Sequence, residues 1–248
     1  MRIPRIYVDL KNLKKSFVFL SKKDLNYIRN VLRLNKHDEI IIFNDKIGEN
    51  LIEILDFSEV GIKYKLIRKK EKKSDFLKLI LIQCILKGWK MDFVIEKATE
   101  LGISEIYPIL SRRVIVKIED QEKKLKRWRE IVKSSAQQCR RVDLPIIHKI
   151  MDIKDLPKNI SDVELKILCW EKEKENSSKK ILKKFNSLSS IAVFVGCEGG
   201  FEDEEVSFLK EKGFISVSLG KLILRSETVP IFVLSCIKYE FENEGWSN

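Results

Sequence analysis

The sequence has few cysteines and histidines, and neither residue type occurs in a pattern that binds metal or forms disulfides. The five cysteines are dispersed at positions 84, 139, 169, 197 and 236, without a CxxC pair. That spacing argues against a zinc ribbon and a disulfide framework. Only two histidines are present, too few for a His-rich metal site and a poor basis for a Ser-His-Asp hydrolase. We therefore expect reduced thiols, a cytoplasmic protein and no metal.

Long apolar runs and common phosphate-binding patterns are also absent. No run approaches the length that spans a membrane, and no signal peptide is recognisable. We therefore expect no membrane association. Neither GxGxxG nor GxxxxGK[ST] occurs, so the two usual glycine-rich sites for nucleotide polyphosphates are not indicated.

Positive charge exceeds negative charge, and the excess is concentrated near the amino terminus. The 248 residues carry 48 Lys and Arg against 37 Asp and Glu, a formal charge of +11. Residues 1–74 hold 18 of the basic and 10 of the acidic residues, a net of +8. Concentrated positive charge in a small domain is typical of a surface that contacts phosphate backbones. A lysine-rich proteome is the alternative, although a general bias should not single out one segment.

Residues 1–70 have the pattern of a small β-domain. Short β-type runs, separated by turn residues, occur at 3–8, 17–20, 39–43, 51–55 and 62–67. One helix is predicted from Lys22 to Leu32, with Ser21 as its N-cap. Short strands with a single helix suggest a small barrel. The polar run Arg68–Asp75 indicates a solvated linker, with a dedicated RNA contact as the alternative.

Residues 71–248 alternate between strand and helix patterns, which predicts an α/β fold with a mostly parallel sheet and helices on both faces. Strands are predicted at 77–85, 103–110, 165–170, 191–195 and 214–219. Helices are predicted at 92–101 and 123–139, and from about Pro230 to Glu240 with Pro230 at the first helical position. Gly102 follows the first of these helices as its C′ residue.

Two glycine-containing turns follow predicted strands within residues 191–230. The first reads Gly196-Cys197-Glu198-Gly199-Gly200, and the second reads Leu219-Gly220 and leads to Leu224-Arg225-Ser226-Glu227-Thr228. In α/β proteins the carboxyl ends of parallel strands present backbone groups to ligands. Glu198 and the acids at 202–205 would repel a pyrophosphate, so hydroxyls, a nucleobase or a sulfonium charge fit better. The alternative is a pair of turns whose glycines serve only positive φ.

The two turns carry a family resemblance. GCEGG and LGKLILRSETVP resemble the GPEGG and LGxRILRxET patterns of the ribosomal RNA small subunit methyltransferase E family. Similar stretches lie, in order, at 1–7 (MRIPRIY), 31–33 (VLR), 87–102 (KGWKMDFVIEKATELG), 111–113 (SRR) and 138–141 (QCRR). The resemblance therefore spans nearly the whole chain. The departures are Cys197 for proline, Ser226 for threonine, Lys221-Leu222 for a Pro-Arg pair, Arg140 for glycine and Asp143 for a basic residue.

The resemblance implies a SPOUT-class enzyme that uses S-adenosyl-L-methionine as its cofactor. It implies a PUA-like RNA-binding β-barrel in residues 1–70 and a SPOUT domain with a carboxyl-terminal trefoil knot in residues 71–248. The implied reaction is methylation of N3 of uridine 1498 in 16S ribosomal RNA of the small ribosomal subunit. The resemblance also implies a homodimer, for which the apolar helix 231–241 offers a surface. Periodicity alone indicates no knot, because knots are rare exceptions.

The chemistry of uridine N3 suggests two catalytic residues. N3 carries a weakly acidic proton and becomes nucleophilic as that proton leaves, so a positioned base or a cation beside O2 or O4 would help. Arg225, which matches the arginine of RxET, is the candidate cation. Glu227 is the candidate to orient Arg225 or to take the proton. The alternative for both is a salt bridge beside a helix start.

The resemblance also places the binding residues. For the cofactor they are Gly196, Glu198, Gly199, Leu219, Gly220, Leu224 and Thr228, with Leu168 and Glu171 as another wall. Independently of the resemblance, the basic residues Arg2, Arg5, Arg29 and Arg33 of the small domain are assigned to RNA backbone contacts. Arg113, Gln138 and Arg141 are candidates to contact RNA or the opposite subunit. Trp89 and Trp128 are expected in a core or interface rather than as base-stacking platforms.

Two other functions are compatible with parts of the sequence. A related SPOUT enzyme acting on transfer RNA or on a ribose hydroxyl would keep the cofactor site and change only the target. A non-catalytic RNA-binding assembly factor would explain the basic amino-terminal domain. It would predict no S-adenosylmethionine binding and would leave the two glycine turns with RSET unexplained.

Overall fold

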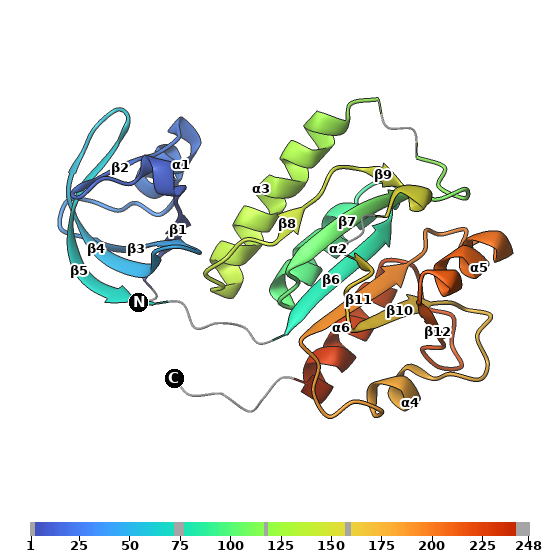
Figure 1. The fold of residues 1–248 in the computed structure, drawn as a ribbon. Helices are drawn as coiled ribbons and strands as arrows, with labels where there is room; N and C mark the ends of the chain where they lie inside the picture. The colour runs from blue at the N-terminus through green and yellow to red at the C-terminus, as the bar shows by residue number, and fades with distance from the viewer. Residues whose placement is uncertain (1–2, 72–76, 117–118, 157–159, 242–248) are drawn as a thin grey trace. The chain divides into compact units, whose positions relative to one another are not determined.

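The structure is a computed structural model that describes residues 3–71, 77–116, 119–156 and 160–241, and it divides into two compact units (Figure 1). The first contains the described part of residues 1–74 together with Ala136–Leu144, and the second contains the rest. A short segment from the middle of the chain therefore clusters with the amino-terminal unit. Each unit has its own sheet.

The amino-terminal unit is built on a five-stranded sheet with the order β1-β3-β4-β5-β2. Its strands are β1 (Arg5–Tyr7), β2 (Phe17–Phe19), β3 (Glu39–Asn44), β4 (Gly48–Phe57) and β5 (Gly61–Lys70). β1 and β3 are parallel, and the other pairs are antiparallel. The five predicted strands are all found, and β1 and β2 lie at the two edges of an open sheet.

A helical segment packs its apolar side chains into the core of this unit. It begins as α1 (Lys22–Asn26) and continues as a π-helical turn, η2 (Tyr27–Val31), while η1 (Leu10–Asn12) is a short 3-10 turn. The predicted N-cap is confirmed, because Ser21 Oγ accepts a hydrogen bond of 3.1 Å from Asp24 N. Leu25 and Ile28 are buried among strand residues such as Ile40, Ile52 and Ile54.

The prediction of a linker at residues 68–75 is wrong at its beginning. Arg68–Lys70 belong to β5, where they pair with Glu49–Leu51 of β4. Their side chains are exposed, so the sequence shows only a charge run. Backbone hydrogen bonds to β4, which leave no trace in side-chain polarity, make this segment a strand. The rest of the predicted linker, apart from Glu71, lies outside the described residues.

The carboxyl-terminal unit has a parallel sheet, which confirms the expected α/β class. Its strands run in the order β12-β10-β11-β6-β7-β8, and β9 pairs with β7. They are β6 (Lys78–Cys84), β7 (Glu105–Leu110), β8 (Ile146–Ile147), β9 (Met151–Asp152), β10 (Leu165–Cys169), β11 (Ser190–Val195) and β12 (Ile215–Val217). All of these pairings are parallel, so the loops that follow neighbouring strands meet at one edge.

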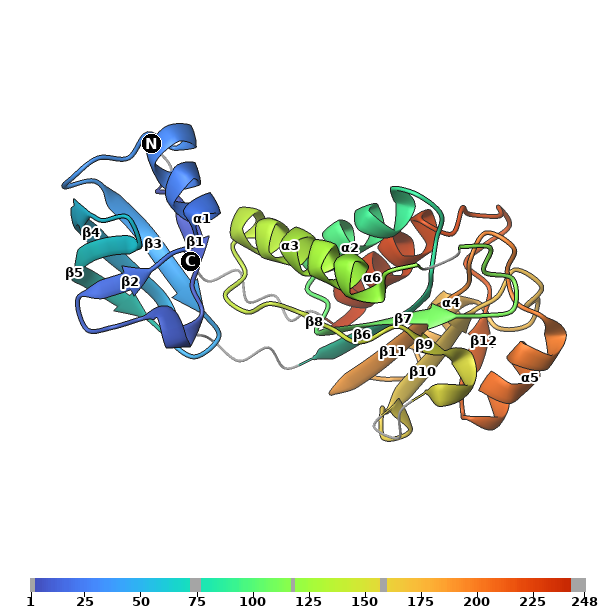
Figure 2. The ribbon, with the colours of Figure 1, turned by 90° about the horizontal axis from the view of Figure 1, so that it is seen from above.

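Helices connect and cover these strands. They are α2 (Lys90–Glu100), α3 (Gln121–Cys139), α4 (Ser178–Leu182), α5 (Asp203–Glu211) and α6 (Thr228–Phe241), with a 3-10 turn at η3 (Ile153–Asp155). Figure 2 shows α2, α3 and α6 on one face of the sheet. Gly102 has the φ of +84° expected of a C′ residue. α6 begins at Thr228 rather than near Pro230, and Pro230 is tolerated because N–H groups of a first turn have no helical acceptor.

Arg140 follows α3 with a left-handed φ of +66°. This is the position where the resembling family has glycine, and glycine adopts that region without steric cost. We expect Arg140→Gly to raise the free energy of unfolding by about 1 kcal/mol. Urea denaturation would measure the change. Arg129→Gly, at an exposed position inside α3, should instead lower it by about 1 kcal/mol. Equal effects of both changes would contradict this account of Arg140.

Glu105 anchors the amino ends of β6 and β7. Its carboxylate accepts hydrogen bonds from Tyr107 Oη (2.8 Å) and pairs with His148 Nε2 (2.7 Å) and Lys78 Nζ. Burial disfavours ionisation of Glu105, but these three partners outweigh burial and hold the pKa of its carboxyl below the usual value. Its contribution to stability is therefore complete above the unfolded-state pKa and is lost as the pH falls through the folded-state pKa.

We expect Glu105→Gln to destabilise the protein by about 2 kcal/mol at neutral pH. The difference should begin to shrink below pH ~4, where Glu105 of the unfolded chain takes up a proton, and should be lost as the pH falls through the lower pKa of the folded state. Urea unfolding at several pH values would measure both effects. Glu59→Gln, at the exposed turn between β4 and β5, is the control and should change little. A difference that stays constant with pH would show that the charge of Glu105 is not responsible.

Candidate functional site

A cavity of about 250 Å³ lies at the carboxyl ends of β10, β11 and β12. The loops that follow these three strands form its walls. The lining residues are Cys169–Glu171, Val195–Phe201, Val217–Leu224, Ser226 and Val229. The cavity therefore lies where the two glycine turns of the sequence come together.

The first glycine turn closes on itself after β11. Gly200 N donates to Cys197 O at 3.0 Å, and Gly200 has a φ of +70°. A Cβ atom on Gly200 would lie 3.0 Å from Glu171 Oε1. The positive φ thus favours glycine at this position, whereas the Glu171 carboxylate lies at the end of a flexible side chain that could shift.

The second glycine turn lies between β12 and α6. Gly220 has a φ of +127°, a conformation that side chains of L-residues rarely adopt, and a Cβ atom there would meet no heavy atom within 4 Å. Leu222 and Ile223 follow with exposed fractions of 80% and 86%. Arg225 O accepts from Thr228 N at 2.8 Å and from Val229 N at 3.1 Å, which fixes the start of α6.

Most of the residues predicted to bind the cofactor line this cavity. They are Glu171, Gly196, Glu198, Gly199, Leu219, Gly220 and Leu224. Leu168 and Thr228 are not among the lining residues. Leu168 is fully buried within β10, and the wall is formed by the residues from Cys169 onward. Near Thr228 in the sequence, Ser226 and Val229 line the cavity instead.

Lys90 links the two glycine turns, and the sequence-based site did not include it. Its Nζ lies 3.3 Å from Glu198 Oε1 and 3.3 Å from Glu227 Oε2. Partial burial disfavours ionisation of Glu198, but backbone N–H groups and Lys90 keep the pKa of its carboxyl below the usual value. Glu198 Oε1 also accepts from Lys87 N at 3.2 Å. Lys90 lies within the stretch KGWKMD, whose similarity to the family was the available signal.

Glu227 and Arg225, the two predicted catalytic residues, have different environments. Glu227 is only 6% exposed. Its Oε2 lies 3.3 Å from Lys90 Nζ. Among the described residues, this oxygen accepts no hydrogen bond. Arg225 is exposed. Within the described part of the chain, its guanidinium has no hydrogen bond or ion pair. Glu227 is therefore buried next to a cation, whereas Arg225 is available to a ligand.

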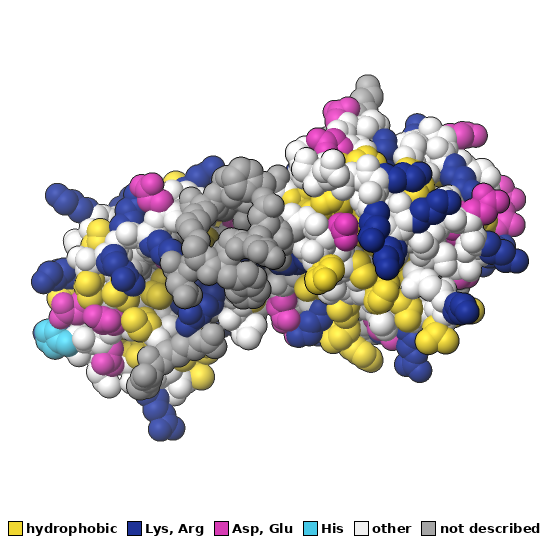
Figure 3. Space-filling view, turned by 90° about the horizontal axis from the view of Figure 1, so that it is seen from below, with side chains coloured by type: hydrophobic (Ala, Val, Ile, Leu, Met, Phe, Trp, Pro, Cys, Tyr) yellow, Lys and Arg dark blue, Asp and Glu magenta, His cyan; other side chains and the backbone are white. Residues whose placement is uncertain are grey.

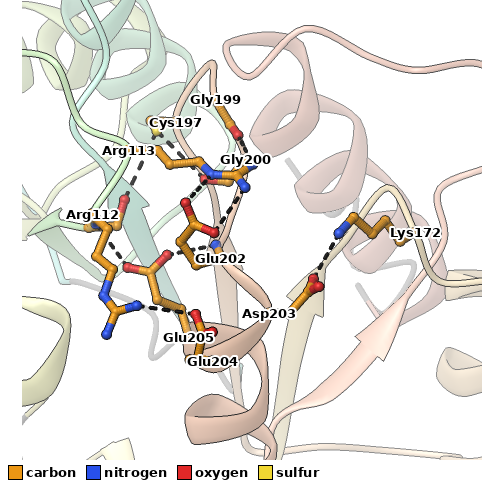
Figure 4. A network of polar contacts seen from close by, with 11 residues as sticks. Arg112, Arg113, Lys172, Cys197, Gly199, Gly200, Glu202, Asp203, Glu204 and Glu205 are labelled. Atoms are coloured by element: carbon orange, nitrogen blue, oxygen red, sulfur yellow. Dashed lines mark hydrogen bonds and ion pairs between the residues drawn. The ribbon is translucent and has the colours of Figure 1, made fainter.

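Arg113, a candidate for contact with RNA or the opposite subunit, lies beside the first glycine turn. Its Nη1 donates to Gly199 O at 2.7 Å, and its Nε and Nη2 bind the two carboxylate oxygens of Glu202 at 2.8 and 3.0 Å (Figure 4). Glu202 precedes α5, and the acids Asp203–Glu205 in the first turn of that helix suit its positive end.

The other candidates for RNA contact belong to the amino-terminal unit and differ in exposure. Arg5 is buried, pairs with Glu49, and lies 4.3 Å above the Phe43 ring. Arg141 is bound to Asp143 at 3.1 Å. The exposed candidates are Arg29, Arg33 and Gln138, and Arg2 lies outside the described residues. Figure 3 shows Lys and Arg side chains spread over this unit in that view. RNA contact by the exposed residues stays a prediction.

The described residues also bear on metal sites and on membrane association. No group of three or more His, Cys, Asp and Glu side chains there could hold a metal ion. No described helix has both the length and the apolar character to cross a membrane. Trp128 is buried, with Nε1 donating to Asp92 Oδ1 at 3.1 Å, as expected of a core residue. Trp89 is 65% exposed.

Comparison with known proteins gives the family. A model of the RNA methyltransferase domain matches residues 72–238. A curated ribosomal RNA small subunit methyltransferase E from Mesomycoplasma hyopneumoniae is 35% identical over 236 residues, covering 94% of this chain and 99% of that protein. The chain belongs to the ribosomal RNA small subunit methyltransferase E family.

Solved structures similar to this chain include two determined with S-adenosylmethionine. One is a ribosomal RNA small subunit methyltransferase E from Neisseria gonorrhoeae, with 27% identity, a TM-score of 0.80, and coverage of 97% of this chain and 98% of that one. The other is a putative methyltransferase from Legionella pneumophila, with 26% identity, a TM-score of 0.84, and coverage of 96% and 98%. The matched RNA methyltransferase domain, residues 72–238, includes both glycine turns that line the cavity.

Proposed function

We propose that this protein transfers the methyl group of S-adenosyl-L-methionine to N3 of uridine 1498 in 16S ribosomal RNA of the small ribosomal subunit, in the cytoplasm. The observation that carries the proposal is the cavity formed by the family's two glycine turns. Family membership supports an RNA substrate, and the solved relatives with S-adenosylmethionine support the cofactor. The position of the target nucleotide rests on the family resemblance.

The residues of the cavity fit the proposed cofactor. Apolar side chains such as Val195, Phe201 and Leu219 suit a nucleoside, and the carboxylates of Glu171 and Glu198 suit a positive charge. The same carboxylates would oppose a phosphate group. Backbone at Gly199 and Gly220 reaches the cavity without a side chain, which permits close approach of a ligand. We infer that these residues hold S-adenosylmethionine.

The bound cofactor would supply an already activated methyl group, so the protein has to position the uracil and remove the N3 proton. Glu227 is the proposed proton acceptor. Its buried carboxylate has an oxygen without a hydrogen-bond donor among the described residues. Lys90 Nζ lies 3.3 Å from this oxygen, and a carboxylate can serve as a general base for a proton within its reach.

Arg225 is the proposed cation for the transition state. As the N3 proton leaves, negative charge develops on the uracil carbonyl oxygens, and a guanidinium beside one of them would stabilise that charge. Arg225 suits this role because it is exposed, lies between two cavity-lining residues, and is not engaged by another described side chain. Glu227 would then accept the N3 proton, and Arg225 would stabilise the negative charge that its departure leaves on the uracil.

A transfer assay tests the proposed function. Small subunits from a strain that lacks the protein would be incubated with the purified protein, labelled S-adenosylmethionine and EDTA. We expect label in 3-methyluridine of 16S ribosomal RNA, with no requirement for added metal. Label in transfer RNA or in a ribose hydroxyl would contradict the target. Absence of transfer and of S-adenosylmethionine binding would contradict the enzymatic function.

We further propose that the two units divide the work. The amino-terminal unit would be a PUA-like domain that contacts RNA phosphates through Arg29 and Arg33. The loops that follow β11 and β12 would belong to the trefoil knot of a SPOUT domain. The first part rests on the basic charge of residues 1–74, and the second on family resemblance.

A homodimer is expected from the same resemblance. α6 presents Phe232, 40% exposed, and Tyr239, 91% exposed, one heptad apart on the helix. Sedimentation equilibrium should give about twice the chain mass of 29.1 kDa. Phe232→Glu should shift the equilibrium towards the monomer. A monomeric wild-type protein with full activity would contradict the dimer.

A further inference from the structure

The segment after β7 is tied to the loop that forms one wall of the cavity. Arg112 N donates to Glu205 Oε1 at 2.9 Å, and Glu205 Oε2 accepts from Glu202 N at 2.9 Å. The carboxylate of Glu205, only 5% exposed, thus joins this segment to the start of α5. Figure 4 shows the arginines and the acids at this junction.

Arg113 extends this junction to the glycine turn itself. One nitrogen of its guanidinium holds the Gly199 carbonyl at 2.7 Å, and two others hold Glu202. A Cβ atom built on Gly199 would lie 3.0 Å from Arg113 Cβ, and one on Gly200 would lie 3.0 Å from Glu171 Oε1. The turn Gly199-Gly200 is therefore packed between the Arg113 side chain and the Glu171 carboxylate.

We propose that Arg113 is a positioning residue for the cofactor, because it fixes the Gly199-Gly200 wall of the cavity in the shape that binds S-adenosylmethionine. This inference rests on the function proposed above. It assigns Arg113 a role different from the RNA contact suggested by its sequence motif. All three guanidinium nitrogens of Arg113 already donate hydrogen bonds to Gly199 or Glu202.

The planar fork is the property that the site uses. A guanidinium can hold a carboxylate with two parallel hydrogen bonds and still donate a third to a carbonyl, whereas a lysine ammonium is a point charge on a flexible stem. Arg113→Lys should therefore behave like Arg113→Ala. Glu202→Gln should have a smaller effect, because the bond to Gly199 remains.

Arg112 provides a matched control. Its side chain makes one ion pair with Glu204, at 3.1 Å, and both side chains are more exposed than Arg113 and Glu202. Among the described residues, the Arg112 side chain makes no hydrogen bond or ion pair with the glycine turn. Arg112→Ala removes the same charge from the adjacent position, while the backbone bond to Glu205 is retained.

The test measures the affinity for S-adenosylmethionine by calorimetry, the affinity for small-subunit RNA, and steady-state kinetics, all well below the melting temperature of each variant. We expect Arg113→Ala and Arg113→Lys to weaken cofactor binding by about tenfold. The KM for S-adenosylmethionine should rise in proportion, while kcat at saturating cofactor and RNA affinity stay near wild type. Arg112→Ala should leave all four quantities near wild type.

Two results would overturn the inference. One is unchanged cofactor affinity of Arg113→Ala, whether or not RNA binding weakens. The other is an equal loss of cofactor affinity in Arg112→Ala, which would show that net charge rather than the clamp matters. If the wild-type protein itself fails to bind S-adenosylmethionine, the proposed function fails first, so the two failures can be distinguished.

Discussion

Replacing Arg225 by alanine is expected to lower the rate of methyl transfer by about 100-fold to 1000-fold. The exposed guanidinium has no partner in the described part of the chain, so its removal breaks no hydrogen bond or ion pair among the described residues. Its loss would instead leave the charge on the uracil carbonyl without a stabilising cation. Steady-state kinetics with small-subunit particles would measure the change in kcat, and RNA affinity should change little.

A contrasting variant separates binding from chemistry. Arg29→Ala together with Arg33→Ala should weaken RNA binding and reduce its salt dependence, because each lost phosphate contact lowers the slope by about one. Saturating RNA should largely restore the rate of this variant. If Arg225→Ala turns over normally, Arg225 has only a structural role and the proposed mechanism is wrong.

Replacing Gly220 by valine is expected to weaken S-adenosylmethionine binding by about 100-fold, since strain of up to about 3 kcal/mol accompanies such a conformation. With its φ of +127°, Gly220 occupies backbone space that a β-branched residue rarely adopts. The neighbourhood of its missing Cβ is open, and Gly220 lines the cavity. The valine side chain would therefore enter the cavity or force the loop to move. Calorimetry would measure the affinity.

Gly102→Val is the matched control for this change. Gly102 also has a positive φ, +84°, and lies at the end of α2 rather than in the cavity. It should lose stability but keep its affinity for the cofactor. Similar affinity of Gly220→Val and wild type would place the cofactor elsewhere.

The sequence predicts the strands well, because apolar runs mark both the alternating and the buried kinds. It misses β8, β9 and α4, which are too short to carry a periodic pattern. It also stops β5 before Arg68–Lys70, whose exposed charges resemble a linker. Strand order is not predicted either. The adjacency of β12, β10 and β11 depends on long-range packing.

The glycine turns could be predicted as a site because family motifs mark them, and the structure brings them to one cavity. Lys90 was missed although it lies in a family stretch, because only three-dimensional proximity to Glu198 and Glu227 gives it a role. Arg5 is the opposite case, a residue that the sequence assigns to RNA contact and the structure buries. A charged residue near a basic terminus suggests RNA contact, but an ion pair with Glu49 allows it to be buried.

Mass spectrometry of 16S ribosomal RNA nucleosides tests the central proposal most directly. The RNA would come from the parent strain, from a strain that lacks this protein, and from that strain complemented with wild type or Arg225→Ala. We predict that 3-methyluridine disappears in the deletion strain, returns with the wild-type protein and does not return with the variant. Full retention of 3-methyluridine in the deletion strain, or the loss of a different modified nucleoside, would contradict the proposed reaction.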